Sequence, residues 1–127
     1  MPIDVKWGDT SSSHIVFIQP YGQWNWLDLD KVVNNILSKI NQQPILTHLL
    51  IDLRQCRETP SPTQTRELKL TTPVPTQLVS SVILGNISMA NAIVFVLRRK
   101  YAINIPFYTA STIEEALKTI FEQYSPH

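Results

Sequence analysis

Asp52 and Arg54 are the charged residues best placed to bind a ligand, because they stand at the end of an apolar run that begins at Ile45. Such a run is typical of a central strand covered on both faces. Ligands of open α/β sheets gather at the carboxyl ends of such strands. With Asn86, which follows the next apolar run, and Trp26, they form the predicted ligand-binding set. The alternative is a structural ion pair, or an Asp52 carboxylate that accepts backbone N–H groups.

Nucleophilic catalysis requires a nucleophile beside a base that a third group holds in place. Of the three histidines, His14 begins an expected strand, His48 enters a buried strand and His127 is the last residue, and no nucleophile-elbow pattern is present. Cys56 has only Arg54 and Arg57 nearby to lower its pKa, so we interpret it as an incidental loop thiol. The sequence therefore predicts a protein that is not an enzyme and has no catalytic residue.

Metal and phosphate sites also lack their usual patterns. No pair among the histidines and the cysteine has the spacing of metal ligands. The chain has only 3 glycines, and none belongs to a phosphate-binding motif. We therefore expect no metal and no cofactor.

Trp24 and Trp26 could form a recognition platform, because paired indole rings supply rigid contact area. The alternative is that they pack the first helix onto the sheet, with Trp24 in the core and Trp26 partly exposed.

The composition indicates one globular domain over residues 1–127, with 43% apolar residues. Only 17% of the residues are charged, against about 25% in an average domain, which indicates that some neutral surface is covered. The net charge of +1 and the single basic cluster, Arg98–Lys100, argue against nucleic-acid binding. No signal peptide is visible, and prolines interrupt the uncharged stretch from Leu70 to Leu97. We expect a cytoplasmic protein without membrane insertion.

The periodicity of the apolar residues predicts strands and helices in alternation after an N-terminal hairpin. This order predicts an α/β fold whose mixed sheet is mostly parallel, with about four helices. The core should include Leu49, Ile51, Val82 and Leu84. The expected strands are 3–7, 14–18, 45–53, 79–84 and 105–108. The expected helices follow the caps Asn25, Ser61 and Ser111, and one further helix begins at about Ile87.

Several motifs recur in this order in one family. Gly22-Gln23-Trp24-Asn25-Trp26 opens the first helix, Leu50-Ile51-Asp52-Leu53-Arg54 ends a strand, Gly85-Asn86 closes the next, and Thr112-Ile113-Glu114-Glu115-Ala116-Leu117 opens the last helix. In these motifs the chain resembles STAS-like domains, and in particular a bacterial STAS-like group. STAS-like domains include anti-sigma-factor antagonists and the cytoplasmic tails of sulphate transporters. The resemblance implies the fold and a regulatory role through protein binding.

One departure concerns the phosphorylation switch of the antagonists. Their Asp-Ser-x-Gly-type motif carries a phosphorylated Ser or Thr at a helix start. Here the stretch reads Thr59-Pro60-Ser61-Pro62-Thr63, without the Asp and the Gly. We therefore expect Ser61 to cap a helix rather than to act as a switch.

The helix expected between Ile87 and Tyr101 has no charge in its first three turns. Its inward stripe should be Ala90, Ile93, Val94, Leu97 and Tyr101, which leaves a neutral outer face of Met89, Ala92, Phe95 and Val96. Such a face suggests a covering partner, either another protein or a second copy of the chain. The alternative for this helix is that a loop of the same chain covers it. The alternative function is the binding of a small apolar or nucleotide-like ligand at the strand ends.

Overall fold

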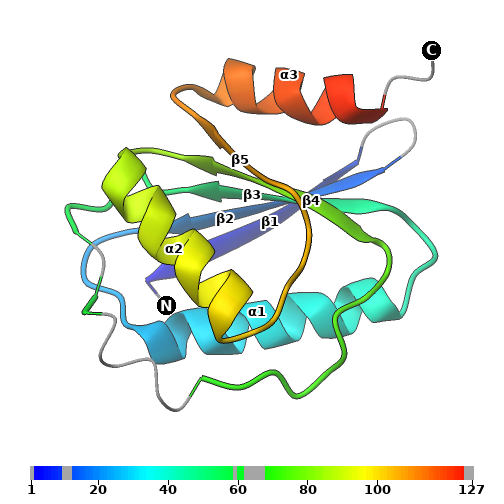
Figure 1. The fold of residues 1–127 in the computed structure, drawn as a ribbon, viewed down its shortest axis with the longest axis horizontal. Coiled ribbons are helices and arrows are strands. Elements are labelled where there is room, and N and C mark those ends of the chain that lie inside the picture. The colour runs from blue at the N-terminus through cyan, green and yellow to red at the C-terminus, as the bar shows by residue number, and fades with distance from the viewer. Residues whose placement is uncertain (1, 10–12, 59, 62–67, 125–127) are drawn as a thin grey trace.

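The alternating N-terminal residues form the predicted antiparallel hairpin, in which β1 (Ile3–Asp9) pairs with β2 (His14–Pro20). The computed structural model describes residues 2–9, 13–58, 60–61 and 68–124. Three further strands, β3 (Thr47–Asp52), β4 (Leu78–Leu84) and β5 (Phe107–Ala110), run parallel to β2. They join the 5-stranded sheet in chain order, so β1 and β5 are its edges (Figure 1). The predicted mixed, mostly parallel α/β sheet is confirmed.

The described residues form three helices: α1 (Trp26–Asn41), α2 (Ile87–Arg99) and α3 (Ile113–Tyr124). Asn25 and Asp28 form a capping box at the start of α1, as the sequence indicated for the cap. The expected helix from Ser61 falls largely on residues 62–67, which lie outside the described part of the chain. Residues 68–70 are not helical, and the described part of the chain contains three helices rather than the expected four or so.

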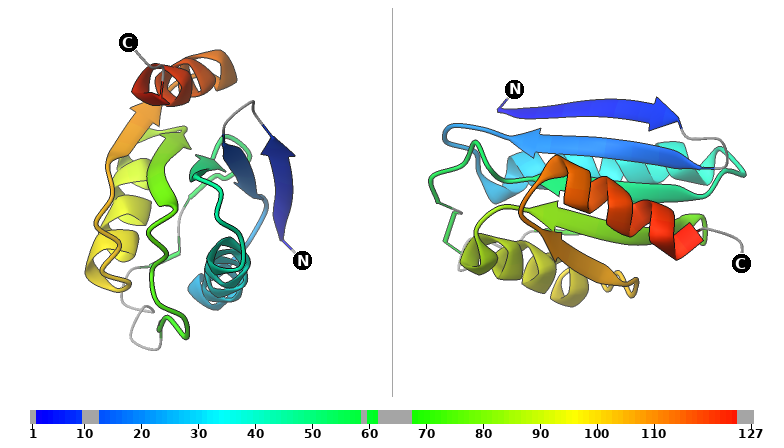
Figure 2. Two further views of the ribbon diagram at one scale, coloured as in Figure 1. Left: turned by 90° about the vertical axis from the view of Figure 1, so that its right-hand side faces the viewer. Right: turned by 90° about the horizontal axis from the view of Figure 1, so that it is seen from above.

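The helices lie on both faces of the sheet, with α1 and α2 on one face and α3 on the other (Figures 1 and 2). Successive residues of a strand point to opposite faces, so Leu49 and Ile51 pack beneath α1 and α2, whereas Val82 and Leu84 pack beneath α3. All of these side chains are buried, which confirms the predicted core. Among the described helices, none is both long enough and apolar enough to cross a membrane.

The packing of α2 corrects the predicted outer face of this helix. Met89 and Val96 are buried in the core, so the prediction that they point outward is wrong. Met89 lies four residues before Ile93 and Val96 three residues after it, and Ile93 belongs to the predicted inward stripe. The buried arc of α2 is therefore wider than the predicted stripe. Ala92 is partly buried, and Phe95 remains exposed.

Candidate functional site

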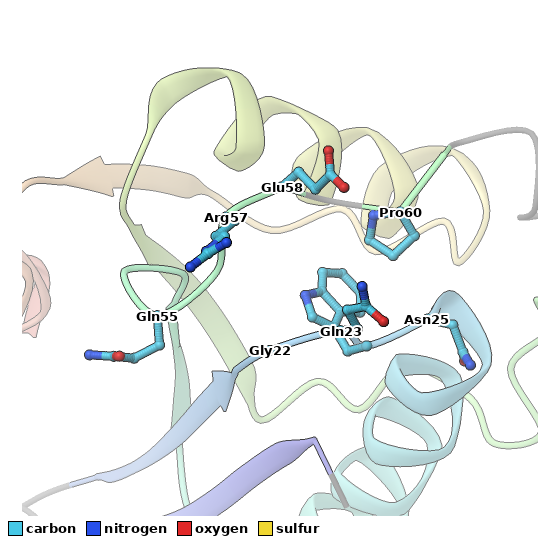
Figure 3. Close-up of a pocket in the computed structure, with 8 residues that line it drawn as sticks. Gly22, Gln23, Asn25, Gln55, Arg57, Glu58 and Pro60 are labelled. Atoms are coloured by element: carbon cyan, nitrogen blue, oxygen red, sulfur yellow. The ribbon is translucent and has the colours of Figure 1, made fainter.

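A cleft of about 810 Å³ lies where the loops after β2 and β3 meet. The two strands are parallel neighbours, so their carboxyl ends lie at the same edge of the sheet. The cleft is lined by Gly22, Gln23, Trp24, Asn25, Gln55, Arg57, Glu58 and Pro60 (Figure 3). This volume is typical of small-molecule sites, which span about 300–1,000 Å³.

The polar groups of the cleft can bind a ligand through charge and hydrogen bonds. Arg57 and Glu58 are exposed and carry opposite charges, and Gln23 and Gln55 add neutral amides. The N-terminus of α1 is less available, because Asp28 accepts the Asn25 N–H at 3.0 Å and supplies a negative charge of its own. Gln23, Gln55, Arg57 and Glu58 were not predicted as site residues, although the carboxyl ends of the strands were predicted as the place of a ligand site.

Cys56 stands in the sequence between Gln55 and Arg57, two residues that line the cleft. Its Sγ donates to the carbonyl oxygen of Pro20 at 3.3 Å. Burial raises the pKa of the thiol, and this effect outweighs that of the neighbouring Trp24 indole. Since the thiolate is the nucleophilic form, Cys56 is poorly suited to nucleophilic chemistry. Within the described segments, no three His, Cys, Asp or Glu side chains are grouped as a metal ion would require.

Asp52 and Arg54 bind each other through two side-chain hydrogen bonds of 2.9 Å. The Arg54 N–H and the Gln19 side chain also donate to the Asp52 carboxylate, at 3.0 and 3.3 Å. Burial alone would raise the pKa of Asp52, but the hydrogen bonds from Arg54 outweigh burial and hold it below its usual value. Both carboxylate oxygens thus have partners within the chain, which is the structural ion pair that the sequence left as the alternative.

Trp26 and Asn86 have structural roles instead of lining the cleft. Trp26 is fully buried, and its indole N–H donates to the Ser61 carbonyl oxygen at 2.9 Å, so the expected partial exposure is wrong. Trp24 is also buried, and its ring meets that of Trp26 edge to face at 5.2 Å between centroids. The Asn86 side chain caps α2. The predicted set of Asp52, Arg54, Asn86 and Trp26 is therefore not brought together in the cleft.

β1 forms a second candidate surface, because its outer side pairs with no other described strand (Figure 2). Its side chains Val5 and Trp7 are 36% and 37% exposed. They line a groove of about 430 Å³ between β1 and α1, to which Lys31, Asn35 and Lys39 contribute from the helix. Large apolar side chains beside an unpaired strand are a typical docking surface for another chain.

The hydrogen bonds between β1 and β2 decide which backbone groups of β1 stay unpaired. The Tyr21 N–H donates to the carbonyl oxygen of Pro2 at 2.9 Å, and the two residues continue the register of the hairpin. Hydrogen-bonded and non-hydrogen-bonded pairs alternate along an antiparallel ladder. The even-numbered residues of β1 therefore bond to β2, and the backbone groups that point outward belong to the odd-numbered residues Ile3, Val5, Trp7 and Asp9.

Comparison of the sequence with models of protein families and with curated proteins finds no match.

Proposed function

We propose that the chain is a non-catalytic, STAS-like regulatory domain of the cytoplasm that acts by binding another protein. The observation that carries this proposal is the outer side of β1, which pairs with none of the described strands, next to the exposed Val5 and Trp7. A strand with free N–H and C=O groups can bind a partner through backbone hydrogen bonds, while neighbouring apolar side chains add contact area. The predicted α2 surface is less suitable, since only Phe95 and part of Ala92 remain accessible there.

The positions of the family-like motifs support the STAS-like assignment. The Gly22–Trp26 motif leads into α1, and the Leu50–Arg54 motif ends β3. Gly85-Asn86 joins β4 to α2, and the Thr112–Leu117 motif opens α3. Each motif thus lies at the element boundary that the resemblance implies.

Replacing Val5 by Pro tests the docking surface. The Val5 N–H points outward, so the substitution removes a donor from the outer side and leaves the hydrogen bonds to β2 in place. The chain, carrying a C-terminal tag, is purified from its own cells, and the bound proteins are compared for the parent, Val5→Pro and Phe95→Glu. The proposal expects Val5→Pro to lose a bound protein that Phe95→Glu keeps. It is wrong if the same proteins bind to all three variants.

The cleft supports a second candidate function, the binding of a small nucleotide-like ligand. The volume of about 810 Å³ and the two exposed charged residues of its lining, Arg57 and Glu58, are the observations in its favour. Native mass spectrometry of freshly purified protein tests it, because a retained ligand adds to the mass of the chain. This candidate expects the added mass to disappear in an Arg57→Ala variant and to persist in Val5→Pro. An unchanged complex in Arg57→Ala would contradict it.

A further inference from the structure

We propose that the protein which docks on β1 is a second copy of the chain, paired antiparallel in one defined register. In this register Asp4 lies opposite Lys6 of the second copy, and a two-fold axis passes between the two Val5 residues. The two sheets then form one continuous sheet. The inference rests on the proposed function and specifies its partner.

The backbone of β1 fits this register. Ile3, Val5 and Trp7 carry the outward N–H and C=O groups, so they must meet one another's copies in an antiparallel ladder. With the axis at Val5, each Val5 exchanges both hydrogen bonds with its copy, and Ile3 does so with Trp7 of the second copy. Asp4 and Lys6 then occupy a non-hydrogen-bonded pair, in which opposed side chains lie closest together.

The charges of β1 select this register from its neighbours. Both Asp4 and Lys6 are exposed on the sheet face that α3 partly covers. Moving the axis to Asp4 places two Asp4 carboxylates opposite each other, and moving it to Lys6 does the same with two ammonium groups. Opposed like charges destabilise a ladder, and opposed unlike charges stabilise it. All three registers pair odd-numbered residues with odd-numbered residues and so align the outward backbone groups in hydrogen-bonded pairs. Only the register centred on Val5 also pairs Asp4 with Lys6.

The other face of β1 supplies the apolar contact. Val5 meets its own copy, and Trp7 lies beside Ile3 of the second copy, above the groove along α1. Pairing therefore shields side chains that are about one-third exposed in the single chain. Lys31 and Lys39 line the same groove, but their long side chains can extend into solvent. A two-fold contact of this kind closes on itself and yields a dimer.

Two charge reversals test the register by sedimentation equilibrium. Asp4→Lys places a lysine opposite Lys6 of the second copy, and Lys6→Asp places an aspartate opposite Asp4 of the second copy. Each variant alone should shift from dimer toward the 14.5 kDa of one chain. An equimolar mixture should recover the dimer mass, because a chain with two lysines then meets a chain with two aspartates. Lys118→Asp, the same charge change on the exposed surface of α3, should sediment like the parent.

Circular dichroism shows whether each variant is folded, and Lys6→Gln replaces Lys6→Asp if the latter unfolds, with a smaller shift expected. The inference is overturned if the parent is monomeric at the highest attainable concentration, if either folded reversal stays as dimeric as the parent, or if the mixture remains monomeric. A monomeric parent that still binds another protein, and loses it in Val5→Pro, would overturn the second copy as partner and leave the proposed function standing.

Discussion

Asp30 joins three parts of the chain through individual hydrogen bonds. Asp30 lies in α1, and its Oδ1 accepts two hydrogen bonds. One comes from the hydroxyl of Tyr101, a residue just after α2, and the other from the N–H of Lys69, a residue between β3 and β4. Burial and the Asp30 carboxylate raise the pKa of Tyr101, so its hydroxyl remains a donor. Periodicity predicted that Tyr101 is buried, but no sequence pattern identified its partner, which is 71 positions away.

Replacing Tyr101 by Phe should therefore lower the free energy of unfolding by about 1–2 kcal/mol, because the variant keeps the ring but loses a hydrogen bond to a charged group. Urea denaturation measures this as a lower midpoint with an unchanged slope. A midpoint equal to that of the parent would show that the bond contributes nothing to stability.

His48 should make the stability of the protein depend on pH. It is fully buried, its Nδ1 lies 2.6 Å from the Ser80 hydroxyl, and burial lowers its pKa from 6.5 to about 4. Below pH 6.5 the unfolded chain binds a proton here that the folded chain does not bind. The stability that neutral His48 contributes is therefore fully present above that pH and is lost as the pH falls toward about 4.

Urea melts between pH 7 and pH 4 check this expectation. The free energy of unfolding of the parent should fall as the pH falls, and His48 should contribute up to about 1.4 kcal/mol per pH unit to this decrease. A folded His48→Gln variant should have a smaller slope over the same range. Equal slopes for both proteins would contradict the assignment.

Among the secondary-structure elements, the strands and two of the helices were predicted more accurately than the surface of α2. Continuous apolar runs identify strands buried on both faces, and β3 and β4 lie within two residues of their predicted limits. The buried arc of α2 was underestimated, because periodicity gives the centre of a helix face but not how far neighbouring elements cover it. The contacts that bury Met89 and Val96 come from elsewhere in the chain.

Leu49 and Leu46 provide a matched pair for the core of the sheet. Leu49 is 2% exposed in β3, whereas Leu46, just before the strand, is 39% exposed. Leu49→Ala should cost about 2–5 kcal/mol of stability, because it leaves a cavity. Leu46→Ala should cost less than about 1 kcal/mol, since the residue is largely solvated. If urea melts gave similar costs for both, the placement of β3 would be wrong.

Phe95 and Val96 provide a similar pair on α2. Phe95 is 48% exposed and Val96 is fully buried, although they are neighbours in the sequence. Phe95→Glu should keep the helical circular dichroism signal and the oligomeric state of the parent. Val96→Glu should unfold the protein or melt far below it, because it buries an unpaired charge. If Phe95→Glu dissociated a dimer that the parent forms, the interface would lie on α2 rather than on β1.

The sequence predicted the order of the elements along the chain but not which surfaces of the protein remain uncovered. The N-terminal hairpin was expected, and its position at the edge of the sheet leaves one side of β1 without a neighbour among the described strands. The sequence predicted the location of a ligand site, at the carboxyl ends of the strands, but not the residues that line the cleft. Its lining depends on loop conformations, which apolar periodicity does not encode.

The most direct test of β1 as the site of self-association is amide hydrogen exchange, measured residue by residue by NMR. The Lys6 N–H bonds to β2 and should be protected in monomer and dimer alike. The Val5 and Trp7 N–H groups point outward and should be protected only when a second copy is paired. We therefore expect the Val5 and Trp7 amides to lose protection when the parent is diluted and in the Lys6→Asp variant. The Lys6 amide of the parent should stay protected on dilution. Val5 and Trp7 amides that exchange freely at every concentration would contradict the account.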